Sequence, residues 1–508
     1  MPLEIKKQAL EIESLAGAQT AQALLRAEAL VPGAGREAVE ALMTEARLTI
    51  DRTDVQNGRV VIDGAAWCQC VYRQGEEATL RALSAKATLS HVFEMDGIEA
   101  GLTCRVYGRV EHVEARYENG HMVFEVAALL RAQVLRLEQT EVITDVSGLT
   151  ALECDHQQIR SVKLAAENVV SVPLREEVSL PAALDARMAL MEWGGAQVES
   201  AVADLGGVRV KGRVNLETLI SSGVPGRPAA LVKYPLTFDQ LVELPDWLTQ
   251  DVEAEAELER LETRVDQGGE GEDAVLRIEA EVRLKLQAYR TDEADALADA
   301  YTTAGPGLRV ERRALTYAAR IERLRCAEPF RGALILPENA PLVGSVLAAR
   351  VLPDLAEWRS ENGRAVLQGV LEACVLYMPA GSDRLASVRG ELPFSLECPG
   401  VLNEDSWLRL EAVSADASAL MSDRIELRCD LLVNGETRAT GHAEVAERLE
   451  EIEETPRRPA IVVCWPGEED TLWSIGKRYK LPIEAVAALN GGKQTLQPGK
   501  ALVLNGAR

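Results

Sequence analysis

The chain has 508 residues, of which 47% are hydrophobic and 27% are charged. This length exceeds what a single hydrophobic core supports, and the composition is typical of folded globular proteins and not of disordered ones. The formal net charge is −25, from 55 Lys and Arg against 80 Asp and Glu. So acidic a chain repels phosphate backbones, which argues against nucleic acid as a partner.

Neither a secretion signal nor a membrane span is expected from the sequence. The N-terminal Lys6 and Lys7 have no apolar run behind them that could serve as the core of a signal peptide. No apolar run is long enough to cross a bilayer as a helix. The nine cysteines, an odd number scattered from Cys68 to Cys464, suit buried free thiols in a reducing compartment. We therefore expect a protein that is made and kept in the cytoplasm.

A pattern of proline, glycine and a large apolar residue occurs three times along the chain. A glycine follows each proline by 31 or 32 residues, and a large apolar residue follows the glycine by 25 or 26. The positions are Pro32, Gly64 and Leu89, then Pro181, Gly212 and Phe238, then Pro337, Gly369 and Phe394. This spacing predicts three copies of one unit, at 1–150, 151–305 and 306–445. The first copy is the divergent one, because it lacks the prolines that precede the phenylalanine in the other two.

Each copy is expected to hold one helix near its start and strands after it. The residues after Pro181 are good helix formers with apolar positions near helical spacing, and proline suits the first turn of a helix. Asn57-Gly58 and Asn362-Gly363 are tight-turn signals that lead into strands. Apolar and charged residues alternate between Ile278 and Leu286, and the glycine-rich segment Asp266–Asp273 predicts a hairpin loop. The expected fold class is therefore mainly β with some helix (α+β).

Three such copies, each with an apolar residue and proline before the first element and a glycine in the next strand, resemble SPOCS domains. These domains occur in spore coat assembly proteins of endospore-forming bacteria. The resemblance covers roughly residues 20–440 as a pattern of landmarks and not as sequence identity. It implies a role in fold and assembly and no catalytic site.

The chain changes character after the third copy. Glu444–Arg458 is acidic and then turns to proline and arginine, which predicts a helix end followed by a linker at 446–460. From Ile461 to Arg508 six Lys and Arg stand against four Asp and Glu, so this end is mildly basic. An acidic body with a basic end indicates two separate roles.

Residues 461–508 resemble a LysM domain, a small module with the element order β-α-α-β. Ile461–Cys464 is expected to form the first strand and Ala501–Leu504 the second. Asp470 is expected to cap a helix that starts at Thr471. Pro482 is expected to open a second helix, which Asn490 ends, with Val486 and Leu489 turned inward.

In LysM domains a shallow glycan-binding cleft lies between the loop before the first helix and the segment after the second. The resemblance assigns the cleft to seven residues: Gly467, Asp470, Thr471, Leu472, Asn490, Gly491 and Leu496. Where the family has Gly-Asp-Thr, this chain has Gly467-Glu468-Glu469-Asp470-Thr471, so two acidic residues lengthen one wall. Leu472 and Leu496 are either apolar anchors for a protein partner or plugs of the small core.

The sequence predicts no enzyme, no cofactor and no metal site. Cys68-Gln69-Cys70 puts two thiols on one face of a strand, but no second pair accompanies it, which favours buried thiols over a metal or redox site. The segment 491–495, GGKQT, has only a faint likeness to a phosphate-binding loop. No nucleophile elbow and no zinc-binding HExxH motif is present.

The combination of SPOCS-like copies with a C-terminal LysM domain resembles the spore morphogenetic scaffolds of clostridial sporulators. The resemblance implies a scaffold made in the mother cell that lies at the forespore surface. Its LysM module would tether the morphogenetic ATPase of the coat basement layer, among other coat proteins. Two alternatives stay open: a LysM protein that binds peptidoglycan or another N-acetylglucosamine glycan of wall or cortex, and a wall hydrolase with an unrecognised site.

Overall fold

The computed structural model describes residues 3–33, 38–75, 80–268, 272–453, 461–489, 491–492 and 495–505. Up to residue 452 these ranges form long antiparallel strands, and the last of them form a small module with two α-helices. Within the described residues, no helix is long and apolar enough to span a bilayer.

The strands fall into three sets of six. The first set is β1 (Glu4–Leu30), β2 (Val39–Gln56), β3 (Arg59–Gln74), β4 (Leu80–Glu94), β5 (Thr103–Glu118) and β6 (His121–Ser147). The second is β7 (Leu152–Leu180), β8 (Ala186–Asp204), β9 (Gly207–Ser222), β10 (Ala229–Glu243), β11 (Val252–Asp266) and β12 (Ala274–Thr302). The third is β13 (Gly307–Ile335), β14 (Val343–Glu361), β15 (Arg364–Pro379), β16 (Ala386–Pro399), β17 (Trp407–Met421) and β18 (Arg424–Ile452).

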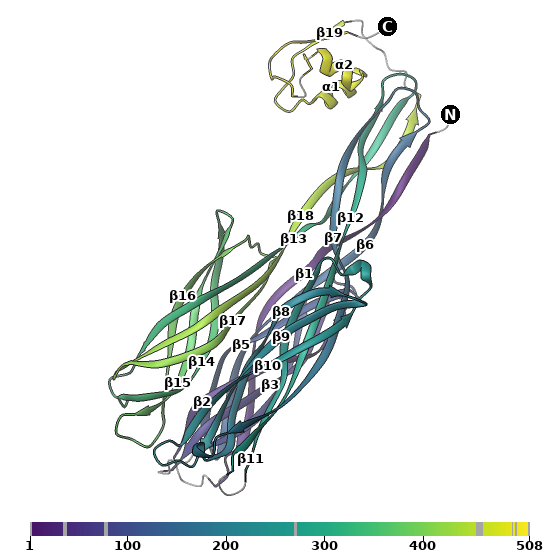
Figure 1. Cartoon of the computed structure of the whole chain (residues 1–508). Helices are drawn as coiled ribbons and strands as arrows, with labels where there is room; N and C mark the ends of the chain where they lie inside the picture. The colour runs from purple at the N-terminus through teal and green to yellow at the C-terminus, as the bar shows by residue number, and fades with distance from the viewer. Residues whose placement is uncertain are drawn as a thin grey trace.

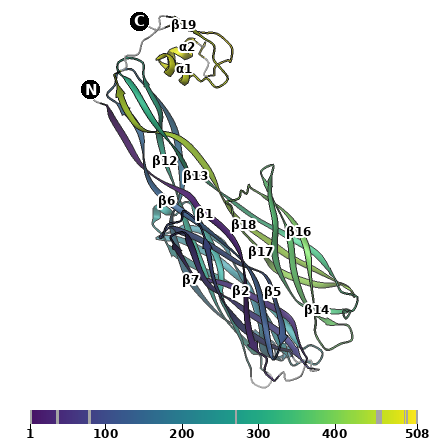
Figure 2. The same ribbon diagram turned by 180° about the vertical axis from the view of Figure 1, so that it is seen from behind.

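All three sets share one strand order. The sixth strand of each set lies between the first and the fifth, and the third lies between the second and the fourth. Each set thus makes two three-stranded sheets, which pack face to face around an apolar core of their own. The long first and sixth strands continue beyond these sandwiches as two-stranded ribbons, and the three ribbons together form a stalk (Figures 1 and 2).

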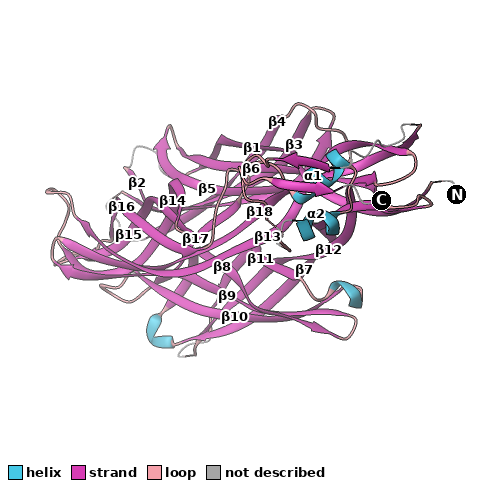
Figure 3. Ribbon diagram, turned by 90° about the horizontal axis from the view of Figure 1, so that it is seen from above, coloured by secondary structure: helices cyan, strands magenta, loops and turns pink. Residues whose placement is uncertain are grey.

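The stalk is filled by residues at matching positions of the three ribbons. One apolar cluster includes Leu10, Ile159 and Leu315 from the first strands with Val142, Ala296 and Val445 from the sixth strands. At the other end, a second shared cluster includes Leu42 and Leu190, with Leu347 packed against it. Each of these three leucines is the extra residue of a β-bulge in the second strand of its set. The three sets are therefore joined at both ends by equivalent apolar contacts. Figure 3 shows the strands of the three sets from above, coloured magenta.

The three glycines predicted as equivalent occupy one structural context. Gly64 pairs with Leu89, Gly212 with Phe238 and Gly369 with Phe394, so each apolar landmark lies directly across the ladder from its glycine. On the other side of each glycine the neighbouring strand has a bulge. A Cβ at any of the three would collide with a backbone carbonyl oxygen of that bulged strand. The prediction of a repeated glycine position is confirmed.

Other expectations for the repeats are confirmed in part. The alternation from Ile278 to Leu286 lies in β12 with its apolar residues buried, as predicted. The hairpin at Asp266–Asp273 joins β11 to β12, although residues 269–271 fall outside the described ranges. The expected helix after Pro181 is wrong, because only a short 3₁₀ turn, Ala182–Leu184, precedes the strand β8. The expected helix end at Glu444 is also wrong, since β18 continues to Ile452 through the first part of the predicted linker.

Candidate functional site

The C-terminal module has the expected order of elements. It consists of β19 (Ile461–Cys464), α1 (Leu472–Tyr479), α2 (Ile483–Leu489) and β20 (Leu502–Asn505). The two strands pair antiparallel, and the small core holds Cys464, Leu472, Ile475, Leu481, Val486, Leu502 and Leu504. Val486 is buried as predicted, but Leu489 was predicted inward and is 42% exposed.

The loop before α1 is held by Asp470, although not as the predicted helix cap. Asp470 accepts hydrogen bonds from the Gly467 backbone N–H (3.0 Å) and from Ser474 Oγ (3.2 Å), and it pairs with Arg478 at 2.8 Å. The hydrogen bond from the Gly467 N–H holds the pKa of this carboxyl below its usual value. Burial acts in the opposite direction, but the hydrogen bond and charge of Arg478 add to the lowering. Because its oxygens are engaged within the module, Asp470 shapes the loop and offers little to a ligand.

Thr471 is the residue that caps α1. Its hydroxyl accepts from the Ser474 backbone N–H (3.1 Å), and Ser474 Oγ accepts from the Thr471 N–H (2.9 Å), which is a reciprocal capping box. Glu468 and Glu469 are exposed at the outer side of the loop. This wall of the predicted cleft is therefore acidic.

The opposite wall is described only in part. Asn490, a predicted cleft residue, lies outside the described residues together with 493 and 494. Gly491 and Gly492 are exposed and adopt positive φ, closing the end of α2 through bonds to Ala488 and Ala487 carbonyls. Leu496 is half-buried against the core, and Leu472 is a core residue at 6% exposure. Of the two candidate anchors, the structure places Leu472 in the core.

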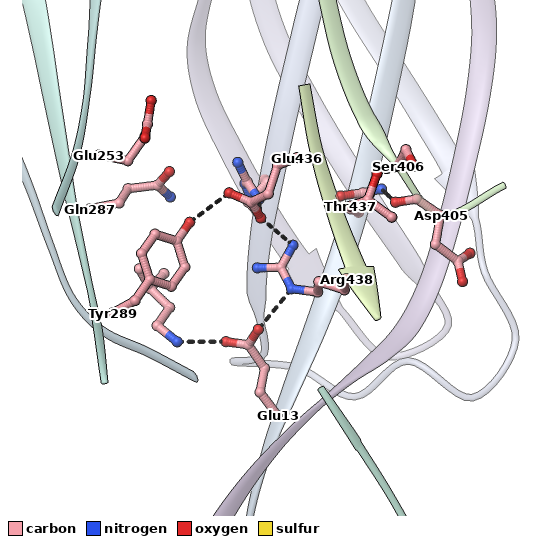
Figure 4. A network of polar contacts seen from close by, with 12 residues as sticks. Glu13, Glu253, Gln287, Tyr289, Asp405, Ser406, Glu436, Thr437 and Arg438 are labelled. Atoms are coloured by element: carbon pink, nitrogen blue, oxygen red, sulfur yellow. Dashed lines mark hydrogen bonds and ion pairs between the residues drawn. The ribbon is translucent and has the colours of Figure 1, made fainter. Parts of the chain in front are cut away.

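A cluster of buried polar side chains, absent from the sequence predictions, lies where the three strand sets meet (Figure 4). We call it the central polar network: Glu13, Arg105, Tyr289, Glu436 and Arg438. Glu436 accepts from Arg105 (2.6 Å), pairs with Arg438 (2.6 Å) and accepts from the Tyr289 hydroxyl (2.8 Å). Arg438 also pairs with Glu13 at 2.9 Å. One carboxylate thus ties together strands β5, β12 and β18, one from each set.

The network is a buried ionic junction. The side chains of Arg105 and Glu436 are 3% and 6% exposed. Burial opposes ionisation of Glu436, but the Arg105 and Arg438 charges outweigh it and hold the pKa below its usual value. Next to it Lys163 contacts Glu11 and bonds Asp292 at 2.7 Å. Most residues of the network are far apart in sequence, so their spacing could not have identified the junction. The one signal in the sequence is the presence of charged residues inside strands.

The remaining sequence candidates are the paired cysteines and the segment after α2. Cys68 and Cys70 are fully buried in the first core, where burial raises the pKa of each thiol to about 12. Within the described residues, no group of three or more His, Cys, Asp or Glu could hold a metal ion. The segment after α2 leads through a turn to β20, whereas a phosphate-binding loop opens a helix.

Comparison with known families gives two matches. Residues 38–118 match the family model described as SipL, SPOCS domain, and residues 467–505 match that of the LysM domain. This chain combines a SipL-type SPOCS domain with a C-terminal LysM domain. The SPOCS match corresponds to β2–β5, so it falls on the copy that lacks the shared prolines. Neither the curated proteins nor the solved structures gave a match.

These two domain types are non-catalytic families, and they associate the chain with sporulation and with a module of a glycan-binding type. The match to the LysM family agrees with the β-α-α-β order of residues 461–505. The family matches do not distinguish a protein partner from a glycan at the cleft.

Proposed function

We propose that the protein is a non-enzymatic scaffold of endospore coat assembly, acting in the mother cell at the forespore surface. Support comes from the presence of a SPOCS domain and a LysM domain in one chain. The three strand sets, each a copy of the SPOCS-type unit, form the body, and the LysM module carries the recognition surface.

The partner of the LysM cleft is, in this proposal, the morphogenetic ATPase of the coat basement layer. The cleft lies between the loop 467–472 and the segment 490–496. Its exposed Glu468 and Glu469 stand where the resembled family has a shorter loop, so the wall offers negative charge that suits a basic protein surface. Carboxylates also accept hydrogen bonds from sugar hydroxyls, so the feature that sets this wall apart from the family's glycan-binding loop is its greater length and not its charge.

The test is recruitment in sporulating cells. A fluorescent fusion of the full chain should lie around the forespore, and the double change Glu468→Lys with Glu469→Lys should disperse it. A matched control reverses two exposed charges on the stalk, Glu447→Lys with Glu451→Lys, and should leave recruitment unchanged. Normal recruitment of the cleft variant would show that the partner binds elsewhere.

The second candidate function is glycan binding, favoured by the LysM match. Sedimentation of the purified chain with isolated peptidoglycan distinguishes the two. The scaffold proposal expects that the wild type binds no more than the cleft variant, Glu468→Lys with Glu469→Lys. Saturable binding that the cleft variant loses would support the glycan function instead, and release of soluble fragments would indicate a hydrolase.

A further inference from the structure

Among the described residues, the LysM module is hydrogen-bonded to the end of the second stalk ribbon. Trp473 donates its indole N–H to Asp299 Oδ2 (2.8 Å), and Lys477 Nζ lies 2.6 Å from both oxygens of the same carboxylate. The Tyr301 hydroxyl donates to the Leu481 carbonyl (2.8 Å). Asp299 and Tyr301 are among the last four residues of β12, which ends at Thr302. Figure 1 shows the helices of the LysM module beside the end of the stalk.

Most of the contact surface is one stripe of α1. Trp473, Gly476 and Lys477 recur at helical spacing and face Tyr301 or Asp299, and Lys480, the residue that ends the helix, lies over the Tyr301 ring. The Trp473 and Tyr301 rings meet edge to face with centroids 4.9 Å apart. A side chain at Gly476 would collide with the Tyr301 hydroxyl, so the missing Cβ allows this close approach. A separate stripe of α1, with Leu472 and Ile475, packs into the module's own core.

The receiving residues are buried. Asp299 is 3% exposed and Tyr301 is fully buried, although both lie at the tip of a ribbon. Asp299 also pairs with Arg312 of the third ribbon at 2.8 Å. A carboxylate and a phenol so deeply enclosed at a ribbon end would be costly without partners, and the LysM module supplies most of them.

The other two ribbon ends lack this combination. The sixth strand of each set has a one-residue bulge near its end, and this bulge aligns the three ribbons. The three residues after the bulge are Asp145–Ser147 in the first ribbon, Asp299–Tyr301 in the second and Arg448–Glu450 in the third. Asp145 bonds the next backbone N–H just as Asp299 does, but it is half-exposed and pairs with Lys6. Only the second ribbon offers both an acid and an aromatic ring to α1.

We infer that the end of the second ribbon is a dedicated docking site for helix α1 of the LysM module. Asp299 and Tyr301 select this ribbon among three otherwise similar ones and fix the orientation of the module. The dock uses the side of α1 away from the loop 467–471, whose residues Gly467, Glu468, Glu469 and Thr471 remain exposed. The stalk therefore presents the cleft in one orientation without covering that wall, whatever ligand the cleft takes.

NMR relaxation of the full-length chain tests the docking. In the wild type, backbone amides of α1 should tumble at the rate of the whole 508-residue protein. Lys477→Glu, at a side chain that is one third exposed, places a second negative charge against Asp299 and should shorten the correlation time of these amides severalfold. On the receiving side, the double change Asp299→Asn with Tyr301→Ser removes the acid and the ring, and it places at 301 the serine that the first ribbon has at Ser147. This variant should also shorten the correlation time of the α1 amides severalfold.

The matched control is Asp145→Asn, at the equivalent position of the first ribbon, which should leave the α1 amides unchanged. The amide spectrum of each variant also reports whether the LysM module is folded. Independent tumbling of the module in the wild type would overturn the inference. So would a folded module that still tumbles with the body in both docking variants.

Discussion

Gly212 lies between a bulged neighbour strand and the ring of Phe238. A Cβ at this position would meet the Gln197 carbonyl oxygen and two atoms of that ring. The backbone carbonyl belongs to a paired strand and has no room to retreat. A single missing methyl group thus permits the bulge, and the same requirement recurs at Gly64 and Gly369.

We predict that Gly212→Ala destabilises the body by about 1–3 kcal/mol, the range expected for overpacking. The control is Gly195→Ala in β8, where an added Cβ meets no atom within 4 Å. That change should be within about 0.5 kcal/mol of neutral, as for other open sites. Urea denaturation of both variants measures the difference, and equal stabilities would contradict the proposed steric cause.

The buried thiols predict how the stability of the fold changes at high pH. Burial raises the pKa of Cys68 and Cys70 from 9.0 to about 12, so the fold holds protons that the unfolded chain releases. Their contribution to stability is complete below pH 9.0 and is lost as the pH rises from there towards about 12. We expect both thiols to resist iodoacetamide at pH 8 in the native state and to react in urea. Native alkylation of either, mapped by mass spectrometry, would contradict their burial.

At the scale of elements, the strands were predictable where one face is apolar and the other polar, and they were unpredictable where a bulge interrupts this alternation. The alternation in β12 identifies a strand because its apolar residues keep period two through Leu286. In β8 the bulge at Leu190 buries Leu190 and Met191 in succession, so the apolar positions approach helical spacing. Good helix formers add only tenths of a kcal/mol per residue, and pairing with β9 along the strand outweighs them.

The LysM elements were predictable because a known family carries their pattern, but the details of the loop were not. The helix cap is Thr471 and not the expected Asp470, which hydrogen bonds reveal and spacing does not. Asn490 and residues 493–494 lie outside the described ranges, so the far wall of the cleft remains a prediction. The dock joins helix α1 to β12, and the central polar network joins β5 to β18, in each case across more than a hundred residues of sequence, and no local pattern encodes such contacts.

Thr471 has two proposed roles that substitution can separate. As the helix cap, Thr471→Ala should cost about 1 kcal/mol, while Thr471→Ser keeps the hydroxyl and should cost little. Hydrogen exchange of the α1 amides measures the stability, and forespore recruitment measures the cleft. If Thr471 only caps, recruitment should follow helix stability across both variants. Lost recruitment in Thr471→Ser, with protection retained, would indicate direct contact with the partner.

The whole molecule is a body in which no strand set is independent of the others. Equivalent residues of all three fill the stalk and the opposite junction, and the central polar network crosses between them. Three similar sandwiches could pair in more than one way through apolar contacts alone. A buried charge cluster with one good arrangement penalises the alternatives, which is a role that buried ionic groups can serve.

Glu436 is the most informative residue of this junction. Glu436→Gln keeps the shape but leaves Arg105 without its counter-charge at 3% exposure, so the cost should be roughly 3–5 kcal/mol, as for other broken buried pairs. Tyr289→Phe removes one hydrogen bond to the same carboxylate and should cost roughly 1 kcal/mol. Because the fold holds the pKa of Glu436 below its ordinary value of 4.5, its contribution is complete above pH 4.5 and is lost as the pH falls. Urea denaturation at several pH values should therefore show the wild type and Glu436→Gln furthest apart near neutrality and converging below pH 4.5. A constant gap across this range would mean that the side chain acts by shape and not by charge.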